Sequence, residues 1–113
     1  MSYSFSLTYS HENENVPLEV YFDSNYTSNV SSMFCKVFAE GIKVLSDLST
    51  YEARPILEKF VIYFITNKQE LVELNPENGW GDYSSLYKLL CDMLEANYIA
   101  SHKNAGAIWS VYN

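Results

Sequence analysis

The stretch NPENGWGDY, residues 75–83, constrains the fold of this chain more than any other, because it gathers residues with special backbone preferences. Its proline cannot continue a helix, and Gly79 and Gly81 allow backbone angles that other residues avoid. Asp82 is well suited to cap a helix that follows. The chain is therefore expected to turn here before a new helix, with Trp80 either anchored in the core or presented to a partner.

The N-terminal part of the chain has the two-residue period of strands. Residues 2–10, SYSFSLTYS, alternate large apolar side chains with Ser and Thr, as in a strand with one buried face. A polar turn over residues 11–17 precedes a second alternating run over 18–23, with Val20 on its apolar side. This pattern predicts a hairpin. Its polar face is predicted to carry Ser4, Ser6, Thr8 and Glu19.

Helical patterns occupy the middle of the chain. Residues 24–32, rich in amides and hydroxyls, are expected to form a loop and to cap a helix near 30–40 that ends at Gly41. Ser49 or Thr50 is expected to cap the most buried helix, unless that helix begins at Pro55.

The rest of the chain is predicted to hold two further helical segments and one strand. Asn67 interrupts the buried helix, and a short helix follows it. Asp82 or Ser84 then caps a helix with a leucine stripe over residues 86–94. Residues 97–106 are expected to form a loop, and the β-branched and aromatic residues of 107–113 a final strand.

The order of these elements predicts an α+β fold. The terminal strand can return beside the N-terminal hairpin, because antiparallel neighbours need not be consecutive in sequence. We therefore expect a small antiparallel sheet, made of the hairpin plus the C-terminal strand, packed against about three helices. A length of 113 residues suggests one domain over residues 1–113.

Composition narrows the classes of partner. The formal net charge is −7, which argues against direct binding to nucleic acids or anionic membranes, because both need clustered cations. A basic protein surface is the more natural partner, and the ten tyrosines could supply part of an interaction surface. No run of 18 apolar residues and no leader pattern is visible, so we expect a cytoplasmic protein.

The common catalytic and metal-binding patterns are missing. Cys35 and Cys91 lie in helical patterns and are expected to be buried free thiols. His11 and His102 are expected in loops, and neither has metal-ligand spacing to another His or Cys. The NGWG turn lacks the length and the lysine of a phosphate-binding loop. We therefore predict no catalytic residue, no metal and no cofactor.

The strongest candidate site is polar and neutral. Amides and hydroxyls beside aromatic rings suit hydrogen-bonded recognition of a base, sugar or peptide without the desolvation of a charge. The same residue types also make ordinary caps and turns. Arg54, the only arginine, is either a fork for a carboxylate or phosphate, or an exposed residue at a helix start. The candidate ligand- or partner-binding residues are Asn25, Tyr26, Thr27, Asn29, Asn75, Asn78, Trp80, Asp82 and Tyr83.

The segments NYTSNVSSMF (25–34) and NPENGWGDY (75–83) resemble a scattered family of small uncharacterised proteins of bacteriophages and bacterial genomes. Those proteins have an NYTxN segment that opens a helix, an NGWGxY turn before another helix, and a short C-terminal strand. The resemblance implies a shared fold from about residue 18 onward but no reaction. Here the segment 96–106 is longer than in that family. The matching positions are Asn25, Thr27, Asn29, Asn78, Gly79, Trp80, Gly81 and Tyr83.

These observations lead to two main hypotheses. The first is a non-enzymatic acidic binding protein of phage or mobile-element origin that binds, and could inhibit, a host or defence protein. The second is a protein, expected to form an oligomer, that sequesters a nucleotide-like small molecule in an Asn, Thr and Trp pocket. An enzyme with an unfamiliar site is a third alternative. A protein blocker should depend on surface Tyr or Glu residues, whereas a sequestering protein should depend on Asn29 and Asn78.

Overall fold

The computed structural model describes residues 1–113 and has the predicted α+β architecture, with a three-stranded antiparallel sheet and four helices. Single 3₁₀ turns lie at Ser28–Val30 and Gly41–Leu45. In chain order the strands and helices are β1 (Ser2–Tyr9), β2 (Glu19–Thr27), α1 (Ser31–Cys35), α2 (Thr50–Thr66), α3 (Lys68–Val72), α4 (Tyr83–Lys103) and β3 (Ile108–Tyr112).

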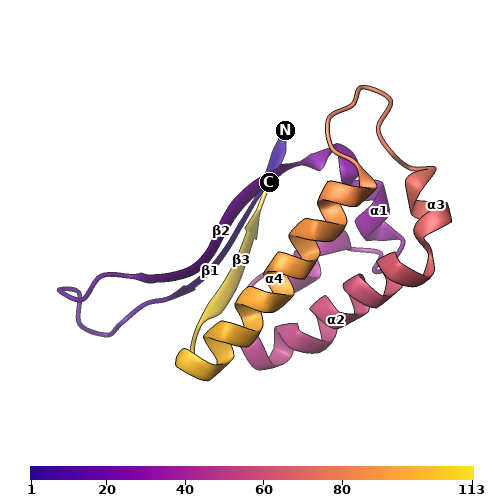
Figure 1. Ribbon diagram of the computed structural model, residues 1–113. Coiled ribbons are helices and arrows are strands. Elements are labelled where there is room, and N and C mark those ends of the chain that lie inside the picture. The colour runs from indigo at the N-terminus through magenta and orange to yellow at the C-terminus, as the bar shows by residue number, and fades with distance from the viewer.

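The sheet has the strand order β2-β1-β3, so the C-terminal strand returns beside β1 as the sequence predicts. Figure 1 shows all the helices on one side of the sheet, the two termini close together, and the β1–β2 hairpin projecting beyond the helices. The free edge of β3 is covered by residues 46–49, because Trp109 exchanges backbone hydrogen bonds with Leu48 and Asp47. No such backbone bonds cover the outer edge of β2.

A β-bulge changes which side chains of β2 face the helices. The register passes from Leu7 opposite Phe22 to Thr8 opposite Val20, so one extra residue enters β2 and the alternation reverses. Val20 therefore lies on the open face and is 56% exposed. Glu19 lies on the helix side, where it accepts from His11 at 2.7 Å. The sequence-based assignment of these two side chains to the opposite faces was wrong because alternation alone cannot reveal a bulge.

One hydrophobic cluster of 22 buried residues fills the space between sheet and helices. The buried stripe of α2 includes Leu57, Phe60 and Phe64, each with no exposed surface. Full burial of such a side chain contributes about 1.5–3 kcal/mol. Trp109 of β3 is also completely buried. No helix combines the length and the apolar character that crossing a membrane requires.

Three predicted boundaries were wrong. Residues 24–27 lie in β2 rather than in a loop, because they pair with Ser2–Phe5 of β1. The helix expected over 30–40 is only α1, Ser31–Cys35, and a separate 3₁₀ turn starts at Gly41. α4 continues through the expected loop as far as Lys103, because the helix buries Ala100 and satisfies the side chain of Asn97 in the interior.

Several single-residue expectations were also wrong. Cys35 is exposed and Cys91 is half-buried, although both are free thiols as predicted. His102 lies within α4. The predicted cap at Ser49, in contrast, is confirmed: Ser49 caps α2 through a reciprocal bond pair with Glu52, so α2 starts ahead of Pro55 and contains it.

Candidate functional site: the Trp80 hollow

The loop between α3 and α4 is held by hydrogen bonds from its own polar side chains. Asn75 Oδ1 accepts from the backbone N–H of Tyr83 at 2.8 Å, and Asn78 Oδ1 accepts from that of Trp80 at 2.9 Å. Asp82 caps α4 by accepting from the Ser85 N–H at 2.8 Å. These bonds give backbone N–H groups of the loop and of the start of α4 partners within the protein, and they stabilise this conformation of the loop.

The two glycines of this loop both have positive φ, 75° at Gly79 and 88° at Gly81, but their surroundings differ. A Cβ on Gly79 would contact nothing within 4 Å. A Cβ on Gly81 would lie 2.6 Å from Thr27 Cγ2 and 3.0 Å from Val30 Cγ1. The loop therefore packs against the end of β2 at Gly81, and only glycine allows that approach.

Tyr26 joins β2 to the start of α4. Its hydroxyl accepts from the Asp82 N–H at 3.1 Å and hydrogen-bonds Ser85 Oγ. Asp82 is exposed, and the Ser85 N–H and hydroxyl that donate to its carboxylate lower its pKa below the ordinary value of 3.8. The cap is therefore charged over the whole neutral range.

Tyr83 belongs to the core. It is 6% exposed, its ring stacks on those of Phe64 and Tyr87, and its hydroxyl donates to the Phe64 carbonyl. Burial raises the pKa of this phenol. Its side chain therefore connects α4 to α2 and is not available to a ligand.

Beside this loop lies an open hollow of about 570 Å³, which we call the Trp80 hollow. The Trp80 side chain is 69% exposed. Asn29 is exposed, its backbone N–H donates to the Thr27 hydroxyl at 3.3 Å, and its side-chain amide makes no hydrogen bond within the protein. The residues that line the Trp80 hollow are Met1, Ser2, Asn25, Tyr26, Thr27, Asn29, Asn78 and Trp80.

Six of the nine predicted site residues therefore come together, although they derive from two segments about fifty residues apart. The other three, Asn75, Asp82 and Tyr83, build the loop and the start of α4. The sequence reasoning missed Met1 and Ser2. The one signal that could have found them is the hairpin register, which sets Ser2 opposite Thr27.

The side chains of the hollow are amides, hydroxyls, a thioether and an indole. They can donate and accept directional hydrogen bonds and offer an aromatic face, which is chemistry for recognition. The chain was compared with family models, curated proteins and solved structures, and none of them matches it. The resemblance to small phage and bacterial proteins therefore stays a prediction.

Proposed function

We propose that this chain is a non-enzymatic binding protein that covers a surface of another protein, with the Trp80 hollow at the centre of the contact. The observation that carries this proposal is an indole that is 69% exposed on a loop held by internal hydrogen bonds. Exposed tryptophans supply a large share of binding energy in protein interfaces. A loop that is already ordered loses little further entropy on binding.

The polar rim of the hollow supports the same role. Asn29 offers a side-chain amide that matches the donors and acceptors of a peptide backbone. Asn25 adds the N–H groups of its side chain, because its Oδ1 already accepts from the Ser4 hydroxyl at 2.8 Å. The net charge of −7 favours a partner with a basic surface, because complementary charge speeds association and disfavours acidic partners. The likeness to phage proteins favours a host or defence protein as the target, bound in the cytoplasm.

The test is a matched pair of variants in affinity capture from host cells. Trp80→Ala removes the exposed indole, and Ile62→Ala removes a side chain that is 59% exposed on α2, away from the hollow. We expect a protein that the wild type and Ile62→Ala retain and that Trp80→Ala loses. Calorimetry with the purified partner should then give at least about a thirtyfold weaker affinity for Trp80→Ala, the 2 kcal/mol typical of a central interface residue. Equal affinities would contradict the proposal.

A second candidate is a protein that sequesters a small nucleotide-like molecule in the same hollow. The volume of about 570 Å³ favours it, because small-molecule sites usually measure about 300–1,000 Å³. Native mass spectrometry of protein purified without denaturation tests it. If the protein sequesters such a molecule, we expect an extra mass of roughly a few hundred daltons per chain, the size range of a ligand for such a site. This extra mass should be lost in Asn29→Ala.

A further inference from the structure

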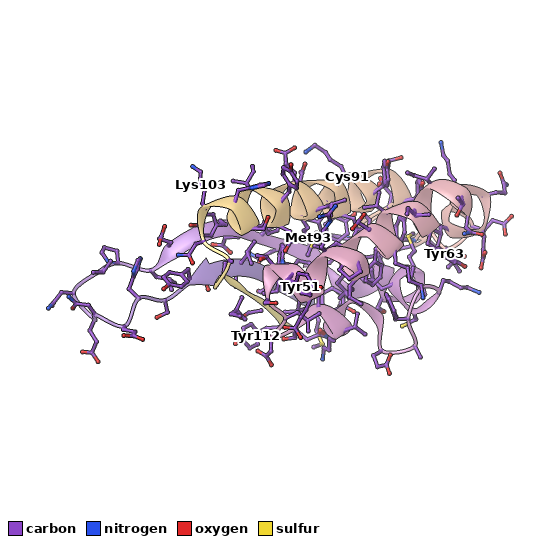
Figure 2. All side chains as sticks on the ribbon, turned by 90° about the horizontal axis from the view of Figure 1, so that it is seen from below. Tyr51, Tyr63, Cys91, Met93, Lys103 and Tyr112 are labelled. Atoms are coloured by element: carbon purple, nitrogen blue, oxygen red, sulfur yellow. The ribbon has the colours of Figure 1, made fainter.

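A second recess lies between α2 and α4, toward the end of α4 that is opposite Trp80. This α2–α4 groove has a volume of about 550 Å³. Figure 2 shows the two helices running side by side, with Tyr51 labelled on α2 and Cys91 on α4. The lining residues that matter here are Tyr51, Arg54, Glu58, Leu94, Glu95 and Tyr98.

The floor of the groove is fixed by a buried asparagine. The Asn97 side chain donates to the Thr50 carbonyl at 3.0 Å and accepts from the Trp109 indole at 2.8 Å. Both Asn97 and Thr50 are 2% exposed. This side chain therefore links α4 to α2 and to β3 through hydrogen bonds within the protein, and the groove exists without a ligand.

Two tyrosines border the groove without contributing to the core. Tyr51 is 87% exposed and Tyr98 is 58% exposed. The faces of such rings attract cations by about 0.5–2 kcal/mol, depending on desolvation. The two rings, together with the apolar side chains of Leu94 and Ala105 in the lining, suit a molecule with an apolar body and a positive end.

The charged side chains of the lining include one more carboxylate than cation, which is the balance that attracts a positive ligand. Arg54 Nε donates to Glu58 Oε1 at 3.1 Å, so the one cationic side chain of the lining is already neutralised. Glu95 forms no salt bridge, and Lys88, whose charge also acts on Glu95, pairs with Asp92 at 2.7 Å. Among the charged side chains of the lining, Glu95 is therefore the one without a salt bridge.

We propose that the α2–α4 groove binds an organic cation, an ammonium or guanidinium group on an apolar body, with its charge beside Glu95 and its body between Tyr51 and Tyr98. The cation is either a free amine or a Lys or Arg side chain of a protein. This site is separate from the Trp80 hollow and does not depend on the function proposed above.

The test is a titration of ¹⁵N-labelled protein, followed by NMR, with phenethylammonium chloride and with its neutral counterpart phenethyl alcohol. We expect saturable shifts at the amides of Tyr51, Leu94 and Tyr98, and about tenfold tighter binding of the cation than of the alcohol. Capped arginine amide is the third probe. Tighter binding of that probe than of phenethylammonium assigns the groove to a protein side chain, and the reverse order assigns it to a free amine.

The matched variants are Glu95→Gln and Glu73→Gln, and each removes one negative charge. Glu95 lies in the groove lining, whereas Glu73 directly follows α3. We expect Glu95→Gln to remove most of the preference for the cation and Glu73→Gln to keep it. Equal binding of cation and alcohol by the wild type, an equal effect of the two variants, or no saturable shift at the groove amides at millimolar probe would overturn the proposal.

Discussion

The two tryptophans of this chain are each positioned by an asparagine, yet Trp109 is completely buried and Trp80 is 69% exposed. Asn97 accepts from the indole N–H of Trp109, whereas Asn78 accepts from the backbone N–H of Trp80. A bond to the indole fixes the ring inside the core. A bond to the backbone fixes the loop and leaves the ring exposed. The same pair of residue types therefore stabilises the core in one region and supports the proposed interaction surface in the other.

The largest effect is expected at the buried tryptophan. Asn97→Ala leaves the Trp109 indole N–H and the Thr50 carbonyl without their partner in the interior. The unsatisfied indole N–H costs about 1–3 kcal/mol and the lost bond to the Thr50 carbonyl about 0.5–1.5 kcal/mol. We therefore expect a loss of about 2–4 kcal/mol in the free energy of unfolding, measured in urea. A loss below about 1 kcal/mol would show that the Asn97 bonds do not hold Trp109 in place.

The two loop glycines give the next largest effect and a control for each other. Gly79→Ala and Gly81→Ala both place a Cβ at positive φ, which costs about 1–2 kcal/mol. Only Gly81→Ala adds a contact of 2.6 Å with Thr27. We expect Gly81→Ala to be the more destabilising of the two in urea denaturation. Equal losses of unfolding free energy in the two variants would contradict the packing of the loop between α3 and α4 against β2.

A smaller effect depends on pH. The pKa of Asp82 is lowered in the folded protein, so its charged cap stabilises the fold fully above the ordinary value of 3.8 and loses this contribution as the pH falls through the lowered pKa. Asp82→Asn keeps an effective cap that does not titrate. We expect the stability difference between wild type and Asp82→Asn to shrink below about pH 4 and to be constant near neutral pH. A constant difference down to strongly acidic pH would be the contrary result.

The smallest effect on stability is expected at Trp80 itself. Trp80→Ala should change the free energy of unfolding by no more than about 0.5 kcal/mol, because its ring is mostly in water and its backbone bond to Asn78 does not need the side chain. A loss of about 2 kcal/mol or more in urea denaturation would place Trp80 with Trp109, as a structural residue.

Much of the fold could be predicted from the sequence because local patterns agreed with the tertiary structure. The alternation of β1, the apolar stripe of α2 and the caps at Ser49 and Asp82 each coincide with the observed elements. The errors arose where a long-range contact overrides the local signal. Asn97 has the composition of a loop residue but is satisfied by Thr50 and Trp109, which are distant in sequence.

The candidate site, too, could be predicted only in part from the sequence. The sequence placed Asn25 and Asn29 near one helix start and Asn78 and Trp80 near another, but nothing local says that the two segments meet. They meet because β2 continues through Thr27 and because Gly81 lets the loop approach that strand end. Whether each asparagine holds the loop or faces the hollow follows from individual hydrogen bonds, which sequence patterns do not encode.

The proposed role of Trp80 requires that the loop over residues 77–81 is rigid, although this loop lies on the surface. ¹⁵N relaxation of the backbone amides of residues 77–81 tests this claim without knowledge of any partner. We predict order parameters near those of the helices, about 0.85. Values below about 0.6 would contradict the account, because a mobile loop would not hold the exposed indole ready to bind.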